Sequence, residues 1–133
     1  MTLVVDGSLI VAGYLPDETS DLVAAVIRRV ARSGALAPVH WPGETANAFS
    51  VAVRRGRIST SDRDMTLSKV AELGIEIDPE TNVHIWGATL RLADLYGLTV
   101  YDAAYLELAQ RRRMPLATLD GPLAEAARKA GVA

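Results

Sequence analysis

Hydrophobic residues follow two alternating patterns along the chain. Short apolar runs, rich in valine, isoleucine and leucine, have the length of buried strands. Longer stretches repeat their apolar positions every three or four residues, as amphipathic helices do. The expected strands cover residues 2–5, 35–39, 75–77 and 116–119. The expected helices cover residues 9–15, 18–33, 42–55, 60–73, 80–96, 103–113 and 122–129.

Helix-start signals place acidic side chains at the beginning of several helices. Pro42 suits a first turn because its missing N–H would have no partner there, and it puts Glu44 in that turn. Asp102 is expected as the N-cap of the helix that follows it. The segment 78–80 is expected to open one long helix that runs to Tyr96.

The order of these elements predicts an α/β fold. Strands separated by one or two helices pair in parallel, because parallel neighbours need a crossover connection. With helices on both faces, the expected architecture is a three-layer α/β/α sandwich around a mainly parallel sheet. The chain has 133 residues, the size of one domain, and neither a repeat nor a linker divides residues 1–133.

Four acidic residues in apolar surroundings stand where strands end or helices begin. They are Asp6, Glu44, Asp102 and Asp120. Ligands of parallel sheets collect beyond the carboxyl ends of the strands, so the four carboxylates are expected together at one edge. Taken singly, each also suits an ordinary structural role, as an N-cap, a first-turn acid or the start of a turn.

Four carboxylates in one place require a counter-charge. Two of them about 5 Å apart repel by roughly 3 kcal/mol at an effective dielectric constant of about 20. The chain has no cysteine and 2 histidines, so a cation would be bound by oxygen, which suits Mg²⁺ or Mn²⁺. Three small polar residues are expected to support the ligands from behind: Ser8, Asn47 and Thr118.

Charge and aromatic content give little direct sign of a nucleic-acid surface. The net charge of −2 argues mildly against binding to phosphates, which normally rests on a basic surface. The few aromatic residues, Tyr105 among them, are expected to pack in the core or at a dimer face. Basic residues nevertheless cluster at Arg28, Arg29 and Arg32, at Arg54, Arg55 and Arg57, and at Arg111, Arg112 and Arg113. The sequence leaves open which of these clusters meets a nucleic acid.

The N-terminal segment suggests neither export nor membrane insertion. It lacks a basic leader and a small-residue cleavage site, and no stretch approaches the roughly 20 apolar residues of a bilayer helix. A cytoplasmic location is therefore expected.

In order and spacing, four short motifs resemble the PIN domains of VapC toxins. They are Asp6-Gly7-Ser8, Pro38 followed by Glu44 and Asn47, Asp102-Ala103-Ala104-Tyr105-Leu106, and Thr118-Leu119-Asp120 with Leu123. The resemblance covers nearly the whole chain. Gly7 stands where the family often has threonine, and Trp41-Pro42-Gly43 before the acidic residue is unusual.

The resemblance implies a metal-dependent endoribonuclease with one or two Mg²⁺ or Mn²⁺ ions. Asp6, Glu44 and Asp102 would be the main ligands, with Asp120 as a further ligand or a water-positioning acid. The family also implies a toxin that forms a homodimer and is silenced by a cognate antitoxin, whose tail occupies the acidic groove.

Two other functions fit parts of the sequence. A phosphoacceptor receiver domain would use Asp78, which follows the strand at residues 75–77. Asp6 lacks the adjacent second acid of such domains, and no Lys-Pro follows the last strand. A catalytically silent PIN-like binding module is the other alternative, and the complete set of four acids argues against it.

Overall fold

The centre of the molecule is a small parallel sheet. The computed structural model describes residues 3–133, so Thr2 of the expected first strand lies outside the described residues. The strands are β1 (Val4–Val5), β2 (Ala35–Ala37), β3 (Ile75–Ile77) and β4 (Leu116–Ala117). Their order across the sheet is β3-β2-β1-β4, and each neighbouring pair is parallel. The predicted mainly parallel sheet is confirmed.

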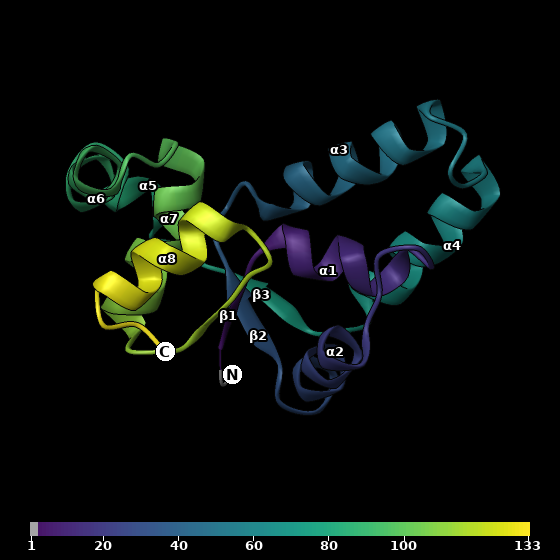
Figure 1. The fold of residues 1–133 in the computed structure, drawn as a ribbon, viewed down its shortest axis with the longest axis horizontal. Helices are drawn as coiled ribbons and strands as arrows, with labels where there is room; N and C mark the ends of the chain where they lie inside the picture. The colour runs from purple at the N-terminus through teal and green to yellow at the C-terminus, as the bar shows by residue number, and fades with distance from the viewer. Residues whose placement is uncertain (1–2) are drawn as a thin grey trace.

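Helices lie on both sides of this sheet (Figure 1). Their bounds are α1 (Gly7–Tyr14), α2 (Asp21–Ser33), α3 (Trp41–Arg54), α4 (Thr60–Ala71), α5 (Thr81–His84), α6 (Ala88–Tyr96), α7 (Val100–Arg112) and α8 (Gly121–Lys129). The first four lie to one side of the strands and the last four to the other. This arrangement confirms the three-layer α/β/α sandwich.

Apolar side chains fill the space between the layers. Val4 and Val5 of β1 are fully buried, in one cluster with Ile10 of α1, Leu106 of α7 and Leu123 of α8. β1 is therefore buried on both faces, which explains its uninterrupted apolar sequence. The residue that follows it, Asp6, is carried to the edge of the core.

Most helix ends lie within three residues of the prediction, and two differences change the interpretation. The expected long helix of residues 80–96 is divided into α5 and α6, because Gly87 between them leaves the helical conformation with φ −117° and ψ −105°. Glycine is a poor helix former, so an interruption at this position costs little. The N-cap of α7 is Thr99 and not Asp102, which lies in the first turn instead.

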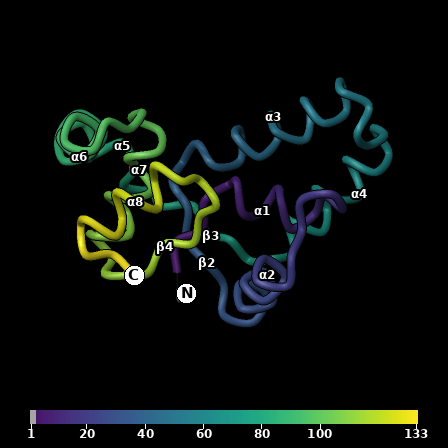
Figure 2. Tube along the Cα trace, viewed as in Figure 1, coloured from purple at the N-terminus to yellow at the C-terminus, as the bar shows by residue number. Residues whose placement is uncertain are grey.

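The C-terminus lies beside the edge strand β4 (Figure 2). The backbone N–H of Leu116 donates a hydrogen bond to the carbonyl oxygen of Ala133 at 3.1 Å. On its other side β4 pairs with β1, as Val4 aligns with Leu116 and Val5 with Ala117. Among the described residues, none of the helices has the length and apolar character needed to span a bilayer.

Candidate metal centre

The four predicted acidic side chains line one open pocket at the carboxyl edge of the sheet, together with a fifth acid that the sequence analysis did not name, Glu18. Asp6 follows β1, Asp120 follows β4, and Glu44 and Asp102 lie in the first turns of α3 and α7. All four border a cavity of about 290 Å³. Residues that are 114 positions apart in the chain, such as Asp6 and Asp120, meet here because parallel strands end at the same edge.

Asp6 is the most buried of the four and is held by two hydroxyl groups. It is only 6% exposed. The hydroxyls of Ser8 and Thr118 each donate a hydrogen bond to its Oδ2 atom at 2.7 Å. These contacts tie the start of α1 to the end of β4. The expectation that Ser8 and Thr118 support a predicted ligand agrees with these bonds, whereas a role toward a metal stays a prediction.

Glu44 is held by a tyrosine from another element. The Tyr105 hydroxyl of α7 donates a 2.6 Å hydrogen bond to Oε1 of Glu44. Burial raises the pKa of Tyr105, and the hydrogen bond to Glu44 raises it further. The phenol therefore keeps its proton at neutral pH and donates it in the hydrogen bond to Glu44.

Asp102 is affected by the charge of the other three acids. Its burial raises the pKa of Asp102, and the negative charges of Asp120, Asp6 and Glu44 raise it further. The Thr99 side chain acts in the opposite direction and does not cancel these effects. The other three acids are thus close enough to Asp102 to disfavour its charged form.

Asp120 is restrained as a helix cap. Its Oδ2 atom accepts a hydrogen bond from the backbone N–H of Leu123 at 2.9 Å, at the start of α8. Its own backbone N–H donates to Oγ1 of Thr118 at 3.0 Å. The sequence suggested the start of an Asp-Gly turn here, whereas Asp120 is the N-cap of α8 and also lies at the pocket.

The donor set of the pocket fits a hard divalent cation. Within residues 3–133, no three His, Asp or Glu side chains are gathered around a common metal position, so an ion would have to bring the acids closer together. The acids border a shared open pocket, and its lining residues include neither lysine nor arginine. Oxygen atoms alone are the ligands that Mg²⁺ and Mn²⁺ prefer.

Asn47 does not join this site. It is exposed and is absent from the residues that line the pocket, where Ala48 lies instead. The reason is helical geometry. With about 3.6 residues per turn, Ala48, four positions after Glu44, faces nearly the same way as Glu44, whereas Asn47, three positions after it, is rotated further away. The expectation that Asn47 supports the ligands is therefore not met by its position.

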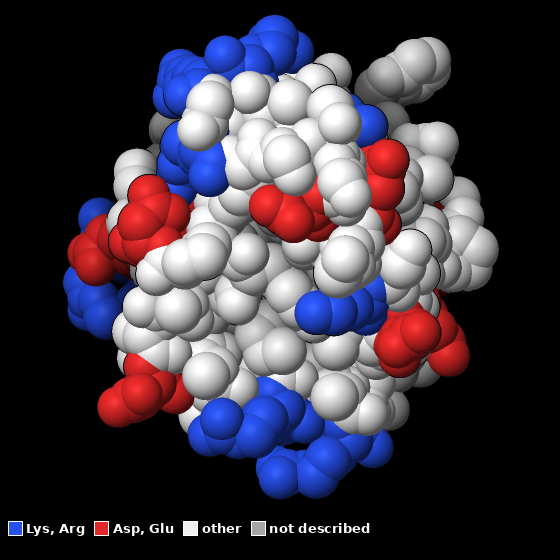
Figure 3. All heavy atoms as spheres, turned by 90° about the vertical axis from the view of Figure 1, so that its right-hand side faces the viewer, with Lys and Arg blue, Asp and Glu red and all other residues white. Residues whose placement is uncertain are grey.

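The basic residues differ in how far they are engaged. Arg57 holds Asp17 and Glu18 at 2.7 and 2.6 Å, and Glu18 lies at the pocket rim. Arg54 and Arg55 are exposed at the end of α3. On the face that contains the far ends of α3 and α4, Lys and Arg gather toward two opposite ends with Asp and Glu between them (Figure 3).

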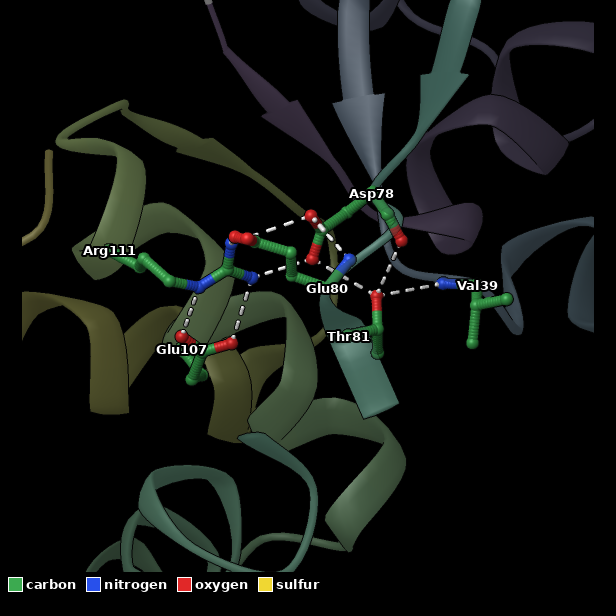
Figure 4. A network of polar contacts seen from close by, with 6 residues as sticks. All are labelled: Val39, Asp78, Glu80, Thr81, Glu107 and Arg111. Atoms are coloured by element: carbon green, nitrogen blue, oxygen red, sulfur yellow. Dashed lines mark hydrogen bonds and ion pairs between the residues drawn. The ribbon is translucent and has the colours of Figure 1, made fainter. Parts of the chain in front are cut away.

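Arg111 is committed to a buried ionic network behind the site (Figure 4). Its guanidinium contacts Asp78 at 2.5 Å and Glu107 at 2.7 Å. Asp78 is 1% exposed and also accepts a hydrogen bond from the Thr81 hydroxyl. Arg111 is therefore not free to bind phosphate. A phosphoacceptor role for Asp78 is contradicted as well, because its carboxylate is buried and paired.

The role of Tyr105 was missed by reasoning from the sequence, which assigned it to packing. The contact with Glu44 joins residues 61 positions apart, and a single sequence contains no signal for such a pair. A partial signal existed: Tyr105 lies one turn after Asp102 in a helix that is buried from Ala103 to Ala109. A hydroxyl in such a helix needs a partner.

Comparison with known proteins places the chain in a family. A sequence profile of the PIN domain matches residues 3–129. Ribonuclease VapC3 of Pyrobaculum aerophilum is 32% identical over 125 residues, which cover 94% of each chain. Ribonuclease VapC3 of Mycobacterium tuberculosis is 33% identical over 124 residues, covering 93% of this chain and 86% of its own.

The fold agrees with this assignment. The crystal structure of PAE2754 from Pyrobaculum aerophilum matches with a TM-score of 0.70 at 25% identity, covering 95% of this chain and 86% of its own. The family profile and the related sequences both extend over nearly the whole chain. The chain belongs to the PIN domain family.

Proposed function

We propose that this protein is a metal-dependent endoribonuclease that hydrolyses RNA phosphodiester bonds as the toxin of a toxin–antitoxin pair. One observation carries the proposal: four carboxylates from four separate elements line a single pocket. Relatives that match over nearly the whole chain are named ribonucleases, which indicates the substrate class.

The proposed ligands of Mg²⁺ or Mn²⁺ are Asp6, Glu44 and Asp102. The chemistry that such a cation supplies is activation of water and neutralisation of charge on the phosphate. Ser8 and Thr118 hold Asp6 in place. Asp120 is the fourth ligand or accepts a hydrogen bond from the attacking water, and its cap bond to Leu123 fixes its direction.

The RNA backbone would be bound by arginines near the pocket and not within it. Arg111 is excluded by its buried partners. We assign this role to the exposed Arg54 and Arg55 at the end of α3, which lie near Arg57, the partner of the pocket residue Glu18. Their positive charges would neutralise phosphates of the RNA, which the acidic pocket alone would repel.

Two protein partners are proposed from the family resemblance. A cognate antitoxin would place its tail in the acidic groove, where a basic side chain complements the carboxylates. A homodimer would use apolar side chains exposed on and around α5 and α6, namely Val83, Trp86, Leu90 and Leu95. Large apolar side chains exposed on a surface can mark protein–protein contacts, so their burial by a second copy is the first arrangement to examine.

The proposal also includes a single domain and a cytoplasmic location. The profile match and the continuous core favour one PIN domain over residues 1–133. A cytoplasmic location remains an expectation that rests on the sequence.

Cleavage of RNA is the direct test. The purified chain is incubated with end-labelled structured RNAs in Mn²⁺, in Mg²⁺, and with excess chelator. We expect cleavage with metal and none with chelator. Asp6→Asn should reduce the rate by at least about 100-fold, because it removes the charge of the most buried acid while keeping its shape. Glu76→Gln is the matched control, since Glu76 is an exposed acid of β3 outside the pocket.

The outcomes separate the remaining alternatives. A variant Asp6→Asn that cleaves RNA like the wild type contradicts the proposal. Metal binding without cleavage of any RNA supports the silent binding module instead. Growth arrest on expression, relieved by Asp6→Asn, tests the toxin assignment apart from the nuclease.

A further inference from the structure

Glu44 differs from the other three acids in how it is held. Its side chain is 38% exposed and lies in the first turn of α3, where water would leave it free to adopt several rotamers. The Tyr105 hydroxyl instead fixes Oε1 at 2.6 Å, and Nε2 of His40 lies farther from the same oxygen, at 3.6 Å. Among the described residues, no hydrogen bond to Oε2 of Glu44 is present, although the residue borders the pocket.

Tyr105 itself has little freedom. Its side chain is fully buried in α7, within the apolar cluster that includes β1. The His40 ring packs edge-on against it with ring centres 5.5 Å apart. Nε2 of His40 lies 3.1 Å from the backbone carbonyl oxygen of Tyr101, and this ring also packs edge-on against Tyr101. The phenol is thus held by the core on one side and by His40 on the other.

We infer that Tyr105 is a positioning residue for the metal site: it holds one carboxylate oxygen of Glu44 so that the other is presented to the cation. The inference rests on the proposed function, because it requires a divalent ion in this pocket. Residues behind metal ligands orient them in this way, and their loss weakens metal affinity by about 10- to 100-fold.

Two of the four acids are held by hydroxyl groups from neighbouring residues. Asp6 is held by two hydroxyls at Oδ2, and Glu44 is held by one hydroxyl at Oε1. Asp6 is short and buried, whereas Glu44 is long and partly exposed. Glu44 therefore has more rotamer freedom to lose, and a pre-formed contact reduces that loss when the cation binds.

Mn²⁺ affinity tests the inference without depending on catalysis. Isothermal titration, or the loss of the free-ion electron paramagnetic resonance signal, gives the Kd of the metal for each variant. Tyr105→Phe removes only the hydroxyl and should raise the Kd by about 10- to 100-fold. Tyr101→Phe is the matched control, because Tyr101 is 61% exposed and its ring contact with His40 survives. Its Kd should stay within about twofold of wild type, the scatter expected for a surface change.

A double-mutant cycle separates positioning from general damage. In the Glu44→Ala background there is no side-chain oxygen left for Tyr105 to orient, so adding Tyr105→Phe should leave the Kd unchanged. An equal further loss in that background overturns the inference. So does a Tyr105→Phe variant that binds Mn²⁺ like the wild type.

A second measurement needs no substitution. The buried, hydrogen-bonded hydroxyl proton of Tyr105 should give a slowly exchanging NMR resonance in the wild-type protein. We expect that resonance to shift on saturation with Mg²⁺, because a cation on Glu44 withdraws charge from the acceptor oxygen. If the resonance is absent, or does not shift while Mg²⁺ binds, the inference about Tyr105 is contradicted and the proposed function is not affected. If the wild type binds no divalent ion, the proposed function fails first and the inference with it.

Discussion

At the scale of single residues, the negative charges of the pocket destabilise one another in the absence of a cation. Burial and the three neighbouring acids raise the pKa of Asp102, so its charged form is less favourable in the folded protein than in the unfolded chain. A cation would reverse this balance by stabilising the charged form. Metal-free and metal-bound protein should therefore respond in opposite ways to loss of the Asp102 charge.

Asp102→Asn is expected to stabilise the metal-free protein. A carboxyl whose folded pKa exceeds its unfolded value lowers the stability of the protein as the pH rises above the unfolded value, so the wild type is penalised at pH 7. Removing the charge should raise the Tm measured in chelator, by a small amount because solvent screens the repulsion at this partly exposed position. Differential scanning calorimetry measures this.

The same variant should lose most of the Tm increase that Mn²⁺ gives the wild type, because binding to the folded state is what stabilises it. A variant that is destabilised in chelator, yet still stabilised by Mn²⁺ like the wild type, would contradict this description of Asp102.

Residue types were predictable from the sequence, but contacts between distant residues were not. The four acids could be named because each follows a strand or opens a helix in apolar surroundings. Ser8 and Thr118 could be named because they lie two residues from Asp6 and Asp120. The Tyr105 contact could not be found in this way, since it depends on the position of α7 relative to α3.

At the scale of elements, a buried ionic network fixes α7, which carries both Asp102 and Tyr105. Arg111 in its last turn is bound by Glu107 of the same helix and by Asp78 after β3. This network connects the sheet edge to the helix behind the site. It also explains why Asp78, at the same edge as the four acids, is not one of them: its carboxylate already has a cation.

Asp78→Asn should be strongly destabilising at neutral pH. Burial would raise the pKa of Asp78, but hydrogen bonds from Arg111, Thr81 and the Glu80 backbone outweigh it and lower the pKa overall. Loss of one partner of a buried pair should reduce the free energy of unfolding by roughly 3 kcal/mol in urea titrations at pH 7. Asp64→Asn is the control, because the exposed Asp64–Arg63 pair should contribute less than about 1 kcal/mol.

The pH dependence has a fixed sign. A carboxyl with a lowered folded pKa stabilises the protein above its unfolded pKa, near about 3.9, and this contribution disappears as the pH falls through the folded value. The difference between wild type and Asp78→Asn should therefore be constant from neutral pH down to about pH 5 and shrink below about pH 4. A difference that grows on acidification would contradict the assignment.

Element types followed from periodicity, while two boundaries depended on local chemistry. The apolar repeat continues across Gly87, so the division into α5 and α6 required the backbone angles of that residue. Thr99 and Asp102 are both good capping residues, and the structure places the cap at Thr99, whose hydroxyl accepts the Asp102 N–H.

At the scale of the whole molecule, the fold brings chemistry from distant parts of the chain to one edge of a sheet. Four short parallel strands end together, and the residues after β1 and β4, with the helices after β2 and before β4, supply the four acids. This convergence follows from topology and could be predicted once the strands were recognised as parallel. The arginines that would bind RNA could not be predicted, because side-chain packing decides which arginines are already paired with acids.

Manganese bound in a crystal tests the central claim most directly. Crystals of the protein soaked in Mn²⁺ should give an anomalous difference peak in the pocket, with oxygen atoms of Asp6, Glu44 and Asp102 as ligands and Asp120 beside them. A soaked crystal of Asp6→Asn should lose most of that peak. If Mn²⁺ binds elsewhere while these four carboxylates have no ion between them, the proposed metal centre is wrong.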